Sequence, residues 1–196
     1  MTNSHVLTAA DILPAADYAK MRVETRRKVS ERKKNRRIEV GPVSTFYFEC
    51  RETMWLQVQE MLHIEKGGAE QLVDELAAYN PLIPNGSELI ATFMIEIDDP
   101  ERRKRVLNQI GGIEEKAFLQ IGDRRIQGVP EADQDRTSAQ GKASSVQFVH
   151  FPFTPTDIAA FRNPGERIVL GFDHANYAHM AIMPEAVRVE LSGDFD

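Results

Sequence analysis

The chain has 196 residues, a formal net charge of −6, 42% hydrophobic residues and 28% charged residues. This composition excludes a wholly disordered chain, and the negative charge argues against a nucleic-acid-binding surface spread over the whole molecule. The length suffices for one domain, residues 1–196, with a core that needs no disulfide or structural metal.

The number of cysteines and the hydropathy of the chain further limit the classes of protein to which it can belong. Cys50 is the single cysteine, which excludes an internal disulfide and a multi-cysteine zinc or iron–sulfur site within one chain. The first residues show no basic segment followed by an apolar run, and the apolar runs are too short for a bilayer. We therefore expect a cytoplasmic protein with no membrane span.

The first predicted element is a basic N-terminal helical segment over residues 8–36, with Pro14 in its first turn or at a break. It could be a nucleic-acid arm, or a solvated helix that docks on the acidic remainder of the chain or on an acidic partner. The lack of interleaved aromatic residues favours the docked helix. Between positions 20 and 37, ten basic residues face two acidic ones, a local balance of 10 − 2 = +8. The ten are Lys20, Arg22, Arg26, Arg27, Lys28, Arg32, Lys33, Lys34, Arg36 and Arg37.

The rest of the chain alternates groups of strands with single helices. Periodicity, glycine pairs and prolines place the boundaries, and the polar stretch 131–145 is predicted to be a mobile loop. The predicted strands cover 37–40, 43–49, 89–97, 116–121, 124–129, 146–153, 167–172 and 178–183. The predicted helices cover 51–66, 69–79, 100–110, 154–161 and 184–191.

These strands fall in pairs and meanders rather than in strict alternation with helices. That order predicts an α+β fold with a largely antiparallel sheet, flanking helices and a long N-terminal helix. Six to eight strands are expected, a number that could curl into a barrel-like sheet.

The helix at 51–66 carries a polar cluster of Gln59, Glu60 and His63 opposite its apolar face. Glu60 and His63 are three residues apart, the ligand spacing of four-helix di-iron carboxylate proteins. That architecture also needs a second such pair and two more glutamates, which this chain lacks in the right context. An ordinary hydrogen-bonded helix face is therefore the competing interpretation.

A second polar cluster surrounds the predicted turn at 173–177. Imidazole, carboxylate and phenol groups could bind a metal or move a proton, although Asp and Asn also build turns without any further role. The cluster consists of Asp173, His174, Asn176, Tyr177 and His179. If it met the helix, Glu60, His63, His174 and His179 would form a nitrogen and oxygen shell suited to Fe, Mn or Zn.

Cys50 stands between a predicted strand and the beginning of a helix, beside Arg51. This is a setting in which thiols can become reactive, and a buried structural thiol is the competing interpretation. No complete nucleophile triad and no glycine-rich phosphate loop is present.

Five segments taken together resemble a known bacterial family, domain-of-unknown-function family 3501. They are KKNRRIEVGP (33–42), FECRETMWLQVQEM (48–61), AYNPLIP (78–84), ATFMIEI (91–97) and DHANY (173–177). The resemblance implies no established activity. It does imply genes beside those for rubrerythrin and an iron–sulfur oxidoreductase, and hence an accessory or interaction protein of a redox-stress module.

The resemblance also marks polar residues of interest. His63 stands where relatives often carry arginine, which shifts the expected site toward Glu60 with His174. The marked residues are Gln57, Gln59, Glu60, Tyr79, Asn80, His174, Asn176 and Tyr177. The alternatives are a small metal- or ligand-binding enzyme using Glu60 and His174, and nucleic-acid binding through 20–37. A homodimer with the long first helix as its dimer element is also expected.

Overall fold

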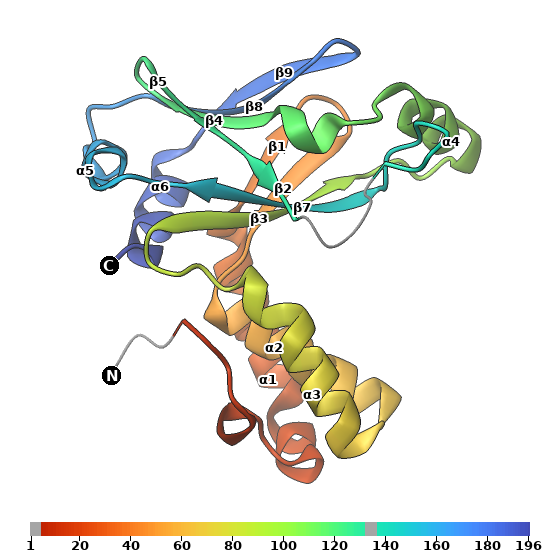
Figure 1. Cartoon of the computed structure of the whole chain (residues 1–196). Coiled ribbons are helices and arrows are strands. Elements are labelled where there is room, and N and C mark those ends of the chain that lie inside the picture. The colour runs from red at the N-terminus through yellow and green to blue at the C-terminus, as the bar shows by residue number, and fades with distance from the viewer. Residues whose placement is uncertain (1–4, 132–136) are drawn as a thin grey trace.

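The computed structural model describes residues 5–131 and 137–196 and shows two antiparallel sheets with a projecting group of helices (Figure 1). The predicted α+β class is confirmed. The helices are α1 (Ala15–Lys33), α2 (Arg51–Glu65), α3 (Gly68–Tyr79), α4 (Pro100–Gln109), α5 (Pro155–Arg162) and α6 (Glu185–Leu191). The strands are β1 (Arg37–Val40), β2 (Ser44–Phe48), β3 (Glu88–Ile95), β4 (Ala117–Ile121), β5 (Arg124–Gln127), β6 (Val129–Pro130), β7 (Val146–Pro152), β8 (Ile168–His174) and β9 (Tyr177–Ile182). Short 3-10 turns are η1 (Ala9–Asp11), η2 (Lys34–Arg36), η3 (Asn80–Leu82), η4 (Ile113–Lys116) and η5 (Ser192–Asp194).

The strands form two separate sheets rather than one. The first has the order β1-β2-β3-β7-β6 and the second β5-β4-β8-β9, with antiparallel neighbours throughout. β1 lies against β8 and β9, so the sheets approach one another at this edge. Within the described residues they do not close into the barrel that the strand count allowed, and β6 is a ninth strand of two residues.

The main core fills the space between the two sheets. Phe46 and Phe93 of the first sheet pack against Phe172 of the second, with ring centroids 5.0 and 5.1 Å from that of Phe172. All three side chains are buried, as the alternation along β2 predicts for Phe46. The second sheet is thus bound to the first through aromatic packing.

A smaller core attaches the projecting helices. Met54 and Val58 of α2 are buried against Ile83 and against Ile90 of β3. α1 and α3 lie on either side of α2, and Phe148 of β7 packs against the same cluster. The outer face of the first sheet therefore carries the helical group (Figure 1).

Two differences from the sequence prediction have a clear physical cause. Proline fixes its own φ and lacks an N–H, so the helix begins only after Pro14, and the preceding residues form the separate turn η1. The turn predicted at 173–177 is shorter, because Asp173 pairs with Ala178 and His174 with Tyr177 across the β8–β9 hairpin.

The predicted loop at 131–145 lies partly outside the described residues, since 132–136 are not described. In its described part, Thr137 forms a bridge with Ala143, and the Thr137 hydroxyl accepts a hydrogen bond from the Gly112 N–H. Elsewhere, no helix in the described part of the chain combines the length and the apolar character needed to cross a bilayer.

Candidate functional site

Cys50 occupies the point where β2 leads into α2, as the N-cap residue of that helix. The Thr53 hydroxyl accepts a hydrogen bond of 2.9 Å from the Cys50 N–H and lies 2.6 Å from a carboxylate oxygen of Glu49. The other oxygen of that buried carboxylate accepts a 2.8 Å bond from Thr92. This network fixes the backbone on both sides of the thiol.

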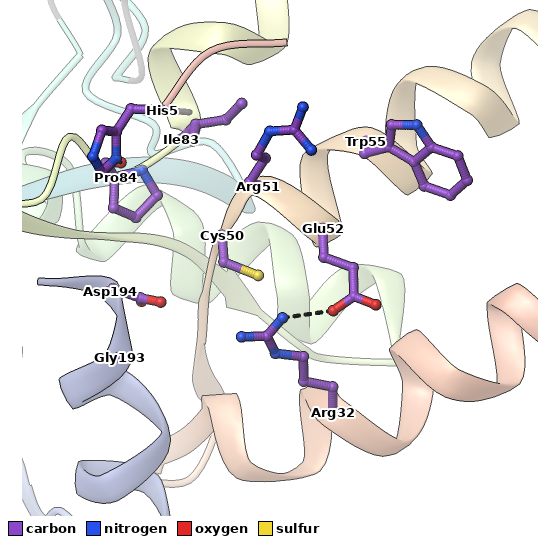
Figure 2. Close-up of a pocket in the computed structure, with 10 residues that line it drawn as sticks. All are labelled: His5, Arg32, Cys50, Arg51, Glu52, Trp55, Ile83, Pro84, Gly193 and Asp194. Atoms are coloured by element: carbon purple, nitrogen blue, oxygen red, sulfur yellow. Dashed lines mark hydrogen bonds and ion pairs between the residues drawn. The ribbon is translucent and has the colours of Figure 1, made fainter. Parts of the chain in front are cut away.

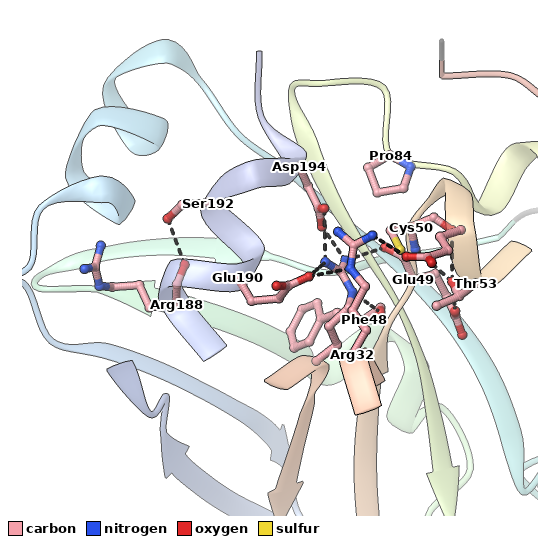
Figure 3. A network of polar contacts seen from close by, with 12 residues as sticks. Arg32, Phe48, Glu49, Cys50, Thr53, Pro84, Arg188, Glu190, Ser192 and Asp194 are labelled. Atoms are coloured by element: carbon pink, nitrogen blue, oxygen red, sulfur yellow. Dashed lines mark hydrogen bonds and ion pairs between the residues drawn. The ribbon is translucent and has the colours of Figure 1, made fainter. Parts of the chain in front are cut away.

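Arg36 is a fully buried cation behind Cys50. Its guanidinium donates to the carbonyl oxygens of Phe48 and Glu49 at 3.0 and 2.8 Å and to Asp194 at 3.1 and 2.5 Å. Burial disfavours the charged form, but interactions with Cys50 and Asp194 exceed this effect and raise the pKa of Arg36. The C-terminal turn η5 is thereby tied to the start of α2 (Figure 3).

Arg32, one turn earlier on α1, approaches Cys50 from the solvent side. It donates to Glu52 at 2.6 Å and to Glu190 at 2.7 Å. Partial burial opposes its charge, yet the hydrogen bonds to both carboxylates and the interaction with Cys50 raise the pKa of Arg32. Two guanidinium groups are therefore within electrostatic reach of a single sulfur.

A cavity of about 390 Å³ opens beside this sulfur. Figure 2 shows the Cys50 side chain directed toward the guanidinium of Arg32, with Arg51 and Asp194 around it. The lining residues come from the N-terminal segment, α1, α2, the turn before β3 and η5. They are His5, Arg32, Cys50, Arg51, Glu52, Trp55, Ile83, Pro84, Gly193 and Asp194.

The cavity wall combines hydrogen-bond donors with the thiol of Cys50. Arg51 donates through Nη2 to Asp11 at 2.6 Å, while its buried Nε has no hydrogen-bond partner in the part of the chain that the structure describes. The Nδ1 of His5 lies 2.6 Å from the carbonyl oxygen of Pro84. A small polar molecule can therefore meet donors and a thiol in the same space.

Glu60, the residue favoured by sequence, lies outside this cavity and is bound to α1. It accepts bonds of 2.8 Å from both Nε and Nη2 of Arg22 and one of 2.5 Å from the Tyr18 hydroxyl. Arg26 lies 3.8 Å away. The hydrogen bonds from Arg22 are the largest cause that lowers the pKa of Glu60 to about 2. Glu60 is thus an ion-pair partner that joins α2 to α1.

The neighbouring predicted residues also make structural contacts. The His63 ring packs edge-on against Tyr18, with ring centroids 5.9 Å apart. Gln57 donates to the Tyr79 hydroxyl at 3.3 Å on the surface. Asn80 accepts from the Leu7 N–H at 2.7 Å and donates to the Leu7 carbonyl at 3.0 Å, which holds the N-terminal segment against η3.

The second predicted cluster stabilises the β8–β9 hairpin and its neighbours. His174 Nε2 lies 3.2 Å from the Gly111 carbonyl oxygen, and Asn176 donates to the Gln109 carbonyl at 2.7 Å. The buried Tyr177 hydroxyl accepts from the Val43 N–H and donates to the Val40 carbonyl, so it spans the β1–β2 turn. Burial raises the pKa of Tyr177.

His179 closes the same turn from outside. Its ring lies 4.6 Å from that of Tyr177, and a Cβ at Gly41 would come within 2.6 Å of it. Gly41 also has a φ of +71°, so glycine is required there for both space and backbone conformation.

The structure does not bring Glu60 and His174 together. Glu60 lies on α2 in the helical group, whereas His174 lies on the β8–β9 hairpin at the other end of the molecule (Figure 1). Within residues 5–131 and 137–196, no three His, Cys, Asp or Glu side chains are placed to hold a metal ion. The geometry therefore does not support a metal shell from Glu60, His63, His174 and His179.

The basic segment is largely neutralised by acidic partners. Arg22 and Arg26 face Glu60, and Arg32 and Arg36 face carboxylates of α2, α6 and η5. Shorter-range pairs involve five more of these basic residues: Lys20 with Asp17, Arg27 and Lys28 with Glu24, Lys34 with Glu31, and Arg37 with Glu39. This geometry favours the docked helix over a free nucleic-acid arm.

Only part of the cavity beside Cys50 could be predicted from the sequence. The strand, cysteine and helix order indicated Cys50, but Arg32 and Arg36 looked like ordinary members of a basic run. Asp194 is 158 positions from Arg36, and no local pattern marks such a pair.

Comparison with known proteins agrees with the fold. A family model described as "Protein of unknown function (DUF3501)" matches residues 6–195. A crystal structure of a novel protein of unknown function from Burkholderia pseudomallei is similar, with 33% sequence identity and a TM-score of 0.90. The match covers 97% of this chain and 100% of that chain. A search of curated proteins gives no match.

Proposed function

The chain belongs to the DUF3501 family, whose function is unknown, and from that premise we propose that it is a redox-responsive accessory protein that acts through Cys50. One observation carries this proposal. The sulfur lines an open cavity and lies within electrostatic reach of the guanidinium groups of Arg32 and Arg36. Cys50 is 5% exposed, and reactive cysteines typically lie near cations that stabilise the thiolate.

The reaction that fits this cavity is oxidation of the thiol by a peroxide. The sulfur attacks one peroxide oxygen, an S–O bond forms and the O–O bond breaks. The sulfur loses two electrons, and the departing oxygen takes the thiol proton and leaves as water or an alcohol. The product is a sulfenic acid. Negative charge develops on the departing oxygen, and guanidinium donors of the cavity would stabilise it.

The return reaction needs an external reductant, because Cys50 is the single cysteine of the chain. A first small thiol condenses with the sulfenic acid to a mixed disulfide and releases water. A second thiol then attacks this disulfide and frees Cys50. The protein therefore signals or buffers an oxidant rather than storing an internal disulfide, in keeping with an accessory role.

The proposal is tested by trapping the sulfenic acid. Reduced protein is treated with hydrogen peroxide in the presence of a cyclic dione that alkylates sulfenic acids, and the product is mapped by mass spectrometry. We expect one adduct, on Cys50, which the Cys50→Ser variant lacks. No adduct under conditions that fully oxidise a cysteine-containing peptide would contradict the proposal.

Two arginines of α1 provide a matched comparison. Arg32→Gln removes the guanidinium beside the sulfur and is expected to slow adduct formation about tenfold. Arg27→Gln changes an exposed arginine of the same helix whose partner is Glu24, and is expected to leave the rate unchanged. Equal rates in both variants would show that Arg32 does not assist the reaction.

The partners expected from the family resemblance, rubrerythrin or an iron–sulfur oxidoreductase, belong to this proposal. Affinity capture of the protein from cells that encode all three tests them. Recovery of either protein supports the accessory role, whereas recovery of neither contradicts the partner assignment.

A metal- or ligand-binding enzyme built on Glu60 and His174 is less well supported, since both residues already bind other groups of the protein. Nucleic-acid binding through residues 20–37 is likewise weakened by the acidic partners of that segment. The role proposed for Cys50 does not require Glu60, His174 or the basic segment to leave these partners.

A further inference from the structure

A second cavity, of about 570 Å³, lies within the helical group and is separate from the Cys50 cavity. It is enclosed by the segment before α1, by α1 itself, by the second half of α2 and by the start of α3. Most of its lining is apolar, with Ile12, Leu13, Leu62 and Leu72 as its large aliphatic members. Its size lies within the range of small-molecule pockets.

Gln59 is the feature of this cavity that a structural role does not explain. The residue lines the cavity and is only 2% exposed. Its side-chain nitrogen is buried and has no hydrogen-bond partner among the residues that the structure describes. Buried amide donors in folded proteins nearly always have an acceptor, so this donor indicates a missing one.

The other polar side chains of the lining are Tyr18, His63 and Lys66, and none of them accepts a hydrogen bond from the Gln59 nitrogen in the part of the chain that the structure describes. The Tyr18 hydroxyl donates to Glu60 at 2.5 Å, and Glu60 is itself held by Arg22. Apolar side chains form most of the remaining wall.

We propose that this cavity binds an uncharged, largely apolar molecule whose carbonyl oxygen accepts a hydrogen bond from Gln59. The aliphatic wall matches an apolar body, and the amide matches a neutral acceptor. Lys66, the cation of the lining, is exposed, so a carboxylate would lose its hydration against the same wall without gaining a buried cation. This site is independent of the thiol chemistry proposed for Cys50.

Benzophenone and diphenylmethane test the proposal, because they have similar shapes and differ in one carbonyl group. Binding to the intact protein is measured by isothermal titration calorimetry, because Trp55 lines the Cys50 cavity and its fluorescence would not distinguish the two sites. We expect both to bind, and benzophenone to bind about tenfold more tightly, the usual effect of one hydrogen bond to a buried donor. Irradiated benzophenone should cross-link to residues of the cavity wall.

Two glutamines on α2 provide the matched variants. Gln59→Leu keeps the volume but removes the donor, so the preference for benzophenone should vanish while diphenylmethane still binds. Gln57→Leu, on the exposed side of the same helix, should keep the preference. The proposal is overturned if neither compound binds the wild-type protein, if both bind it equally, or if cross-links map elsewhere. The ligand pair decides the question on wild-type protein even if Gln59→Leu does not fold.

Discussion

Pairs of buried, oppositely charged side chains join distant segments of this protein. Arg36 and Asp194 form such a pair, with side-chain exposures of 0% and 7%. Replacing Arg36 by Met leaves Asp194 buried beside Glu190 without its cation. We expect Arg36→Met to lower the free energy of unfolding by about 3 to 5 kcal/mol, measured by urea denaturation at neutral pH.

The same pair has a clear control. The double variant Arg36→Met, Asp194→Leu removes both charges and should regain much of the lost stability. Arg27→Met removes an exposed arginine and should cost less than about 1 kcal/mol. A loss in Arg36→Met no larger than in Arg27→Met would show that the buried pair does not hold the C-terminal turn.

Glu60 predicts a pH dependence of stability. Its pKa is about 2 in the folded protein against an ordinary value of 4.5. A lowered carboxyl pKa stabilises the fold above the unfolded value, and this contribution disappears as the pH falls through the folded value. We expect Glu60→Gln to cost about 2 to 3 kcal/mol at neutral pH, after allowance for solvent screening.

The difference in free energy of unfolding between wild type and Glu60→Gln should then shrink as the pH falls from about 4.5 to about 2. Chemical denaturation at each pH measures this difference. Glu70→Gln, at an exposed position of α3, is the control and should show no such pH-dependent difference. A gap that stays constant over this range would mean that Glu60 is not the titrating group.

The role of each polar residue was harder to predict than its presence. The residues flagged on α2 and around 173–177 do make specific contacts, but mostly with main-chain groups and arginines of other segments. Arg22 is 38 positions before Glu60, and Gly111 is 63 positions before His174. Sequence spacing reveals neighbours within one helix, not partners that tertiary packing brings together.

At the scale of elements, the N-terminal segment is held by several side chains, among them Asn80. Asn80 of η3 makes two hydrogen bonds with the main chain of Leu7, and the buried Leu7 side chain packs in the smaller core. Asn80→Ala should cost about 1 to 3 kcal/mol and expose the segment before α1 to limited proteolysis. Asn163→Ala, in an exposed turn, should leave the cleavage pattern unchanged. Identical cleavage in both variants would show that Asn80 does not secure the segment.

The elements themselves were largely predictable. Alternating apolar residues and a proline at position 100 placed β2, β7 and α4 close to their observed bounds. The differences arise where pairing with another strand decides the boundary, as at the β8–β9 hairpin, or where proline divides a helical pattern, as at Pro14.

At the scale of the whole molecule, two features depend on long-range packing. The strands divide into two sheets because Phe172 and its neighbours pack face to face on Phe46 and Phe93, and the sequence alone allowed a single curved sheet. The positive charge of the basic segment is compensated because helix α1 and the turn η2 pair with acidic groups of α2, α6 and η5. The Cys50 cavity lies where these segments meet.

The reactivity of Cys50 tests the central claim most directly. The second-order rate constant for its oxidation by hydrogen peroxide can be measured in the folded protein and in the same protein unfolded in urea at the same pH. If the cavity activates the thiol, the folded protein should react at least about tenfold faster. An equal or slower rate in the folded protein would contradict the claim and leave Cys50 as a buried structural residue.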